Sequence, residues 1–195
     1  MLKSDLNSSP LCGIDEAGRG PLAGDLVMAG VILKYPLNKH LKELNDSKKL
    51  SEKKREFLYD IITKNSEFHI VSFSAKNVDK NGISACLEEG LISIMITINT
   101  DNFLFDGNST FGVENLKTLV KADATIAEVS AASILAKVTH DRAIVEMSKQ
   151  YPEYGFERHK GYGTKHHVEM IKKHGYCEVH RKTYKIKALE KTLFD

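Results

Sequence analysis

Four acidic residues stand where their carboxylates could meet at one catalytic point. Asp15 and Glu16 follow a short apolar run, Asp106 closes the aromatic run NFLFD, and Asp123 follows a third apolar run. Because the ends of neighbouring strands lie side by side in a sheet, acids at three strand ends can converge despite their wide separation in sequence. Crowded carboxylates repel one another unless a hard divalent cation lies among them. We therefore expect a site for Mg²⁺ or Mn²⁺ here, although an acid pair beside glycine is, taken alone, more typical of a solvated turn.

A glycine-rich segment follows the first acid pair. Gly18, Arg19 and Gly20 come directly after it, in the stretch CGIDEAGRGPLAG. Glycine permits positive φ or close approach of the backbone to another group, and we interpret that group as a nucleic-acid backbone. The alternative for Arg19 is a structural salt bridge with Asp15 or Glu16.

Two regions concentrate basic residues. Residues 48–55, which include Lys48 and Lys49, hold five basic residues and one acid beside the expected start of a helix, where free amide groups favour anions. Residues 156–187 hold nine Lys and Arg, three acids and five histidines, with tyrosines such as Tyr162 between them. This texture is typical of a surface that follows a phosphate backbone, and the alternative for the first region is an ordinary solvated face.

Two further chemistries are disfavoured. Neighbours such as His166 and His167 point about 100° apart on a helix and do not easily share a metal ion. Three cysteines without CxxC spacing argue against a disulfide scaffold and a zinc site, and they favour a reducing cytoplasm.

Length and composition favour one compact domain covering residues 1–195. The 195 residues are 42% hydrophobic, and the formal net charge of +2 is too small to indicate a nucleic-acid partner by itself. The longest aliphatic run is far shorter than the roughly 20 residues that a membrane-spanning helix needs. We expect a cytoplasmic monomer with no membrane contact.

The expected elements alternate between strands and helices, which predicts a mixed α/β fold. Residues 11–14 and 25–33 read as a hairpin that presents the first acids. Ser51 and Thr164 are in positions to cap helices, the second running to His174. The remaining elements are a strand over residues 67–73, helices over 83–98 and 126–150, and two strands that end near Asp106 and Asp123. Within the long helix we interpret the small residues 130–133 as structural.

Five motifs in order resemble the ribonuclease HII (type 2 ribonuclease H) family. They are GIDEAGRGPLAG, DSKKLS, FDGN, SAASILAKVT followed by HDR, and HKGYGT. The resemblance extends from Cys12 to about Tyr184. It implies a ribonuclease H-like fold, in which a mixed five-stranded sheet is flanked by helices and residues from about 150 to 195 form a basic C-terminal helical region that binds substrate.

The resemblance also implies an activity. It implies a metal-dependent endoribonuclease that hydrolyses the RNA strand of RNA–DNA hybrids and cuts on the 5′ side of single ribonucleotides in duplex DNA, leaving 5′-phosphate and 3′-hydroxyl ends. Two divalent ions, Mn²⁺ or Mg²⁺, serve as cofactors. The implied catalytic and metal-binding residues are Asp15, Glu16, Asp106 and Asp123. The implied substrate-binding residues are Gly18, Arg19, Gly20, Lys48, Lys49, Tyr162 and Arg181.

The sequence departs from the family pattern at a few positions. Ala122 stands where glycine commonly precedes the fourth acid, which raises a question about the bend of that loop. His140 replaces a frequent arginine, a change that we expect to alter only a surface contact. Thr183 and Tyr184 replace a frequent Ser-Phe pair.

The last residues resemble the Leu-Phe ending of sliding-clamp-binding peptides. Leu193 and Phe194 would be the anchors of a weak contact, and the alternative is simple packing. Two other readings of the whole chain stay open, namely another nuclease of the ribonuclease H fold, such as a junction resolvase, and a non-catalytic duplex-binding module.

Overall fold

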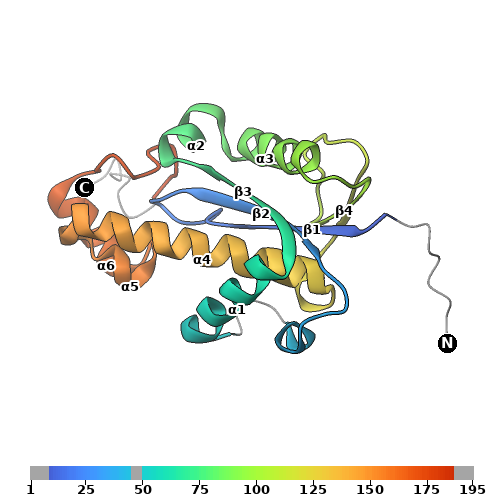
Figure 1. Ribbon diagram of the computed structural model, residues 1–195. Coiled ribbons are helices and arrows are strands. Elements are labelled where there is room, and N and C mark those ends of the chain that lie inside the picture. The colour runs from blue at the N-terminus through green and yellow to red at the C-terminus, as the bar shows by residue number, and fades with distance from the viewer. Residues whose placement is uncertain (1–8, 45–49, 187–195) are drawn as a thin grey trace.

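The computed structural model describes residues 9–44 and 50–186 (Figure 1). Its elements, in chain order, are β1 (Leu11–Ala17), β2 (Leu26–Leu33), η1 (Lys39–Glu43), α1 (Glu52–Lys64), β3 (Ser66–Phe73), α2 (Ala75–Asn81), α3 (Ile83–Thr97), β4 (Asn102–Asp106), β5 (Leu116–Leu119), η3 (Ala122–Ala124), α4 (Ala127–Gln150), η4 (Pro152–Tyr154), α5 (Phe156–His159) and α6 (Lys165–His174). No helix in these ranges is both long and apolar enough to span a membrane.

The strands form one mixed sheet in the order β3-β2-β1-β4-β5. β1 and β2 form the antiparallel hairpin predicted from the sequence, and β3 extends it antiparallel to β2. β4 runs parallel to β1, and β5 runs parallel to β4. The mixed five-stranded sheet with flanking helices confirms the predicted fold class. In this order β1 is central, and its carboxyl end lies beside that of β4.

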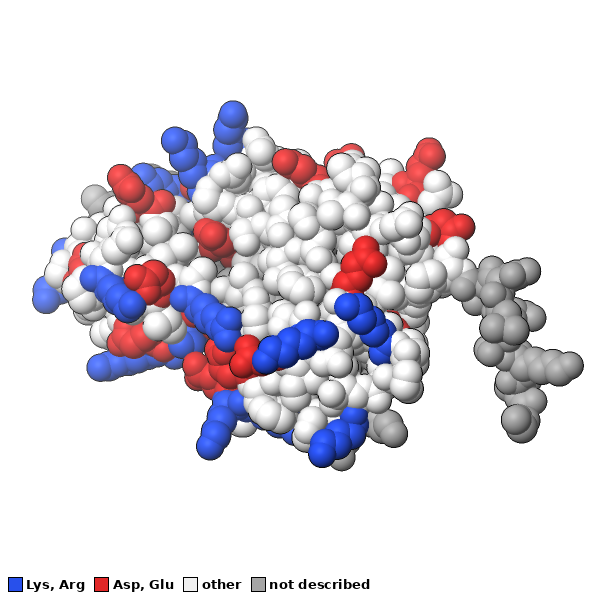
Figure 2. All heavy atoms as spheres, in the orientation of Figure 1, with Lys and Arg blue, Asp and Glu red and all other residues white. Residues whose placement is uncertain are grey.

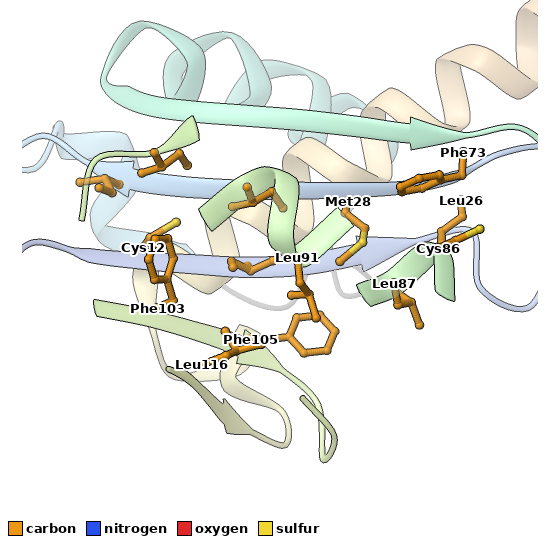
Figure 3. Packing of buried hydrophobic residues seen from close by; sticks show 14 of the residues in the cluster. Cys12, Leu26, Met28, Phe73, Cys86, Leu87, Leu91, Phe103, Phe105 and Leu116 are labelled. Carbon is orange, nitrogen blue, oxygen red and sulfur yellow. The ribbon is translucent and has the colours of Figure 1, made fainter. Parts of the chain in front are cut away.

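Helices cover both faces of the sheet, and β2 is accordingly apolar at every position. Alternate side chains point to opposite faces, so Leu26 and Met28 join the cluster under α3, whereas Val27 and Ala29 join the cluster under α1 and α4. Figure 1 shows α2 and α3 on one side of the sheet and α4 with α1 on the other. Figure 3 shows Met28 in the cluster between the sheet and α3.

Helix α4 approaches the central strand unusually closely. A Cβ atom added at Gly13 would lie 2.3 Å from the backbone nitrogen of Val129, so no larger residue fits there without displacing the helix. The small residues Ala131 and Ala132 face the same cluster. Because α4 lies directly across β1, its polar side chains can reach the acids at the end of that strand.

The C-terminal elements η4, α5 and α6 pack on the far end of α4. Their apolar contacts centre on Tyr154, Phe156 and Ile171, which meet Ala23 and Ile144. This arrangement matches the helical region that the resemblance implied. It also places the loop that carries Tyr162 beside the turn that follows β1.

Two predicted helix caps are confirmed. The Ser51 side chain accepts a hydrogen bond from the Lys54 backbone nitrogen at the start of α1, and Thr164 accepts one from the His167 nitrogen at the start of α6. Each satisfies a backbone donor that the helix itself leaves unpaired.

Candidate active site

The end of β1 brings the first two acids to the sheet edge, but inside the strand rather than after it. The prediction ended this strand at residue 14, whereas β1 continues to Ala17 and contains Asp15 and Glu16. Alternation along the strand therefore directs the two side chains to opposite faces. Asp15 belongs to the face that α4 covers, where it is buried. Asp15 therefore lies among the buried acids beneath α4, whereas Glu16 lines the cavity beside them.

Asp106 reaches the same point from the neighbouring strand. β4 runs parallel to β1 with Ile14 opposite Phe105, so the next residues along each strand, Asp15 and Asp106, lie at the same edge. Asp106 is the last residue of β4. The predicted convergence of these two acids therefore follows from the sheet order, because parallel neighbouring strands bring their carboxyl ends to the same edge.

Asp123 lies in the short helix η3, not at the end of a strand. β5 stops at Leu119, and the chain turns at Lys121, whose φ of 60° and ψ of 33° are left-handed. The backbone nitrogen of Ala122 then donates a hydrogen bond to Asp106 Oδ1 at 3.1 Å. Since the left-handed residue is Lys121, alanine at 122 is compatible with the bend, which answers the question raised by the sequence.

Three of the carboxylates meet. One oxygen from each of Asp15, Asp106 and Asp123 lies within 4.8 Å of the other two. Glu16 is not in that trio; its Oε1 lies 3.6 Å from Arg19 Nη1, and it lines the cavity beside the trio. The salt bridge that was the alternative for Arg19 is thus present, on a side chain that is 53% exposed.

The electrostatics of the trio favour a cation. Burial raises the pKa of Asp15 well above its ordinary value, and the nearby charges of Glu16 and Asp106 add to the rise. Hydrogen bonds from Ser133 and from the Glu16 backbone nitrogen, the latter 2.7 Å long, oppose it. The donor set consists of carboxylate oxygens, which are the ligands that hard divalent ions prefer. A divalent cation therefore fits these residues.

A cavity of about 250 Å³ opens beside the acids. It is lined by Asp15, Glu16, Ala17, Gly18, Arg19, Gly20, Ser133, Lys137 and Tyr162. We call residues 18–24 the Gly-Arg-Gly turn and residues 159–163 the Tyr162 loop. The ring of Tyr162 lies 3.8 Å from where a Cβ atom of Gly20 would be, so the two form neighbouring walls of one cavity.

Gly18 is required by its backbone and its surroundings. Its φ is 86°, and an added Cβ atom would lie 2.3 Å from the backbone oxygen of Asp25 and 2.6 Å from the ring of His140. His140 is fully buried, with Nδ1 2.9 Å from Asp141 Oδ1. The expectation that His140 alters only a surface contact was therefore wrong, because its ring packs beneath the Gly-Arg-Gly turn.

The role expected for Arg181 also needs correction. Its side chain is completely buried, and its guanidinium donates hydrogen bonds to the backbone oxygens of Gly24 and Arg19. A buried guanidinium with these partners does not reach a duplex, so Arg181 supports the turn from beneath. Lys48 and Lys49, like Leu193 and Phe194, lie outside the described residues.

The sequence interpretation missed one polar face of α4. Ser130 donates a hydrogen bond to the backbone oxygen of Asp123, and Ser133 donates one to Asp15. Lys137 Nζ lies 2.7 Å from Asp141 Oδ1 and 6.0 Å from the centre of the Tyr162 ring. The interpretation of residues 130–133 as purely structural was therefore too narrow. The spacing 130, 133, 137 and 141 follows one helical face and was a usable signal.

Charged residues are grouped rather than evenly spread. Figure 2 shows Lys and Arg side chains interleaved with Asp and Glu over the side formed by α1, α4 and α6, while the middle of this face, over the sheet, is largely uncharged. The basic residues on this face are therefore mixed with acids, in keeping with the small net charge of +2.

Comparisons with known proteins agree with this geometry. A family model described as ribonuclease HII matches residues 12–187. The ribonuclease HII of Sulfurovum sp. is 62% identical over 188 residues, covering 96% of this chain and 98% of that protein. The ribonuclease HII of Aliarcobacter butzleri is 55% identical, covering 92% of each chain. Among solved structures, a complex of PCNA with ribonuclease HII from Archaeoglobus fulgidus superposes with a TM-score of 0.79 at 28% identity, covering 94% of this chain and 98% of that chain.

Proposed function

The chain belongs to the ribonuclease HII family, and on that premise we propose how its site works on a substrate. The protein is a metal-dependent endoribonuclease that hydrolyses the RNA strand of RNA–DNA hybrids. It also cuts on the 5′ side of single ribonucleotides in duplex DNA, and it leaves 5′-phosphate and 3′-hydroxyl ends. The C-terminal region from about residue 150 provides part of the duplex-binding surface.

The convergence of Asp15, Asp106 and Asp123 within 4.8 Å carries this proposal. These carboxylates, with Glu16 beside them, would hold divalent ions, for which we propose Mg²⁺ or Mn²⁺. When bound, such ions neutralise the phosphate, activate the attacking water and stabilise the leaving 3′-oxygen. The hydrogen bond from Ala122 fixes the direction of the Asp106 carboxylate.

The walls of the cavity suit the recognition of one ribose. The 2′-hydroxyl is the only group that distinguishes a ribose from its deoxyribose neighbours, so the protein must contact it directly. The Gly-Arg-Gly turn offers backbone close to the acids, and the half-exposed ring of Tyr162 offers a flat surface on which the next sugar can stack. Arg19 adds a positive charge at the rim of the cavity.

The alternative readings have less support. A non-catalytic binding module would have no need for buried carboxylates whose mutual repulsion is unfavourable in the absence of an ion. A junction resolvase of the same fold would have no need for a ribose-reading cavity beside its acids, and the family match covers most of this chain.

A cleavage assay tests the proposal. The substrates are labelled duplexes that contain one ribonucleotide, a continuous RNA strand or DNA alone, each with Mg²⁺, Mn²⁺ or EDTA. We expect metal-dependent cutting on the 5′ side of the single ribonucleotide and no cutting of the all-DNA duplex. Cutting of the all-DNA duplex, or of none of the three, would refute the proposed function.

We further propose a weak contact with a sliding clamp through Leu193 and Phe194. The Archaeoglobus fulgidus relative, which was solved as a complex with PCNA, supports the idea. A pull-down with the clamp would test it, since Phe194→Ala should abolish capture while cleavage continues. Equal capture of both proteins would exclude this anchor.

The remaining proposals concern the cellular setting. We propose a monomer in the cytoplasm that removes ribonucleotides from DNA. Three cysteines, all free, are consistent with a reducing compartment. Cell fractionation, light scattering of the purified protein and the number of alkali-labile sites in genomic DNA after gene deletion test the three statements separately.

A further inference from the structure

A segment after α6 lies against both walls of the cavity. We call residues 177–184 the C-terminal segment. Gly24 donates a backbone hydrogen bond to Val179 at 2.9 Å, and Arg181 donates one to Leu22 at 2.8 Å. These bonds tie the segment to the Gly-Arg-Gly turn, which is more than 150 residues away in sequence.

The side chain of Arg181 fixes the turn from below. Its Nε and Nη2 atoms donate to the backbone oxygen of Gly24 at 3.1 and 2.8 Å, and Nη1 donates to the backbone oxygen of Arg19 at 3.2 Å. The Tyr184 hydroxyl donates to the same Arg19 oxygen at 2.9 Å, and it accepts a hydrogen bond from Arg181 Nη1 at 3.1 Å. Since a peptide group is planar, holding the Arg19 oxygen also sets the direction of the Gly20 nitrogen.

The preceding residue, His180, acts on the other wall. Cys177 donates its backbone hydrogen to His180 Nδ1 at 3.0 Å, so a neutral His180 carries its proton on Nε2. That proton is donated to His167 Nε2 at 3.0 Å, and His167 Nδ1 then donates to the backbone oxygen of Tyr162 at 2.9 Å. Each hydrogen bond in this series therefore has one possible direction, and the series ends on Tyr162, which lines the cavity.

The two walls are joined directly by the hydrogen bond from the Leu22 nitrogen to the Gly161 oxygen, 2.8 Å long, and each wall is also held by one of two adjacent residues of the C-terminal segment. We propose that His180 and Arg181, together with the Tyr184 hydroxyl, are positioning residues that set the separation between the Gly-Arg-Gly turn and Tyr162. This separation determines the preference for a single ribonucleotide in DNA, because the 2′-hydroxyl and the following sugar must be contacted at the same time. The inference rests on the proposed function. Tyr184 stands where the family frequently has phenylalanine, so its hydroxyl is an additional support in this chain.

The first test is Tyr184→Phe, which removes one hydroxyl from a partly exposed side chain and leaves Arg181 in place. Binding is measured in EDTA by fluorescence anisotropy, with a duplex that contains one ribonucleotide and with an all-DNA duplex. We call the Kd for the all-DNA duplex divided by the Kd for the single-ribonucleotide duplex the binding ratio. We expect this ratio to fall by about three- to tenfold, as for the loss of one hydrogen bond. In the presence of metal, kcat/KM for the single-ribonucleotide duplex should fall more than kcat/KM for the long hybrid.

Two further variants and a control complete the test. Arg181→Lys keeps the charge but not the forked set of donors, and His180→Leu removes both the acceptor for the Cys177 nitrogen and the donor to His167. Both should lower the binding ratio further than Tyr184→Phe does. Tyr151→Phe is the matched control, since it removes a hydroxyl that makes no hydrogen bond to a described residue, and its ratio should stay at the wild-type value.

The outcomes separate this inference from the proposed function. If wild-type protein shows no preference for the ribonucleotide, the proposed function itself fails. If wild type shows the preference and Tyr184→Phe keeps it, the inference is overturned, even where the variants lower the melting temperature. Should Arg181→Lys or His180→Leu not fold, Tyr184→Phe alone decides the matter.

Discussion

Replacing Asp106 with asparagine should make the metal-free protein more stable and the enzyme inactive. The amide oxygen of asparagine can still accept the hydrogen bond from the Ala122 nitrogen, so the local geometry is retained. What is lost is one negative charge from a trio whose oxygens lie within 4.8 Å of one another. The perturbation therefore tests whether the carboxylates of Asp15 and Asp123 are truly crowded against Asp106.

The size of the effect follows from that distance. Two unit charges at this separation repel by about 1 kcal/mol at the permittivity of water and by about 3.5 kcal/mol at an effective permittivity of 20. The partial burial of the trio places the gain from Asp106→Asn between these values, at about 1 to 3 kcal/mol of unfolding free energy in EDTA. A proton on Asp15, whose pKa is raised, moves the gain toward the lower value.

Urea unfolding in EDTA and in Mg²⁺ measures this directly. Wild type should gain about 2.7 kcal/mol from an ion present at one hundred times its Kd. The variant should gain much less, so the order of stability should reverse when metal is added. Cleavage by the variant should fall at least about a hundredfold, since a ligand that stabilises charge in the transition state is gone.

The control is Asp101→Asn, which removes the same charge from an exposed residue just before β4. It should change neither stability nor cleavage measurably. The reasoning would be refuted if Asp106→Asn were less stable than wild type in EDTA, or if it cleaved at the wild-type rate.

Three further predictions can be checked with the same purified protein. Gly18→Ala should cost about 3 kcal/mol or more, because φ is 86° and the new Cβ would lie 2.3 Å from a backbone oxygen. In melting experiments it should cost more than Gly82→Ala, which places its Cβ in open space and pays only the backbone strain of φ 83° and ψ 155°, about 1 to 3 kcal/mol. His167 and His180 should destabilise the protein as the pH drops from 6.5 towards 4, because burial lowers the pKa of each to about 4, so that over this range only the unfolded chain binds their protons; the slope reaches at most about 1.4 kcal/mol per pH unit for each histidine. The raised pKa of Asp15 acts in the opposite direction, so the check compares wild type with His180→Leu: between pH 7 and pH 5 the variant should lose less stability than wild type, and equal changes in the two proteins would contradict the prediction. Ala122→Gly should lose about 1 kcal/mol of stability through backbone entropy and keep cleavage within about twofold, as rates beside wild type would reveal.

Local patterns were sufficient for the sheet and for most of the acids. An apolar run, a glycine-rich turn and a second apolar run specify the hairpin of β1 and β2 without distant contacts. The strand character of β1 also contained information that was not used. Because adjacent side chains of a strand point to opposite faces, Asp15 and Glu16 could not have been expected to enter the trio equally.

The two wrong predictions concern side chains that the fold buries, Arg181 and His140. Arginine is almost never fully buried unless it is paired, and histidine is found both inside and outside, so the sequence alone did not place Arg181 or His140 in the interior. For Arg181 these partners are backbone oxygens of a turn more than 150 residues earlier. Such partners are fixed by the packing of the C-terminal segment against the turn, which no spacing within either stretch reveals.

The distance in sequence between the Gly-Arg-Gly turn and its support has a consequence for the order of synthesis. A ribosome completes β1, β4, η3 and α4, with all the acids, well before it adds Arg181. A chain released early, for example just after α6, would carry the carboxylates but would lack the bonds that hold the Arg19 and Gly24 oxygens. A truncated product would therefore have the metal-binding carboxylates without a fixed ribose-contacting turn, and selectivity would be acquired only once the C-terminal segment has been added.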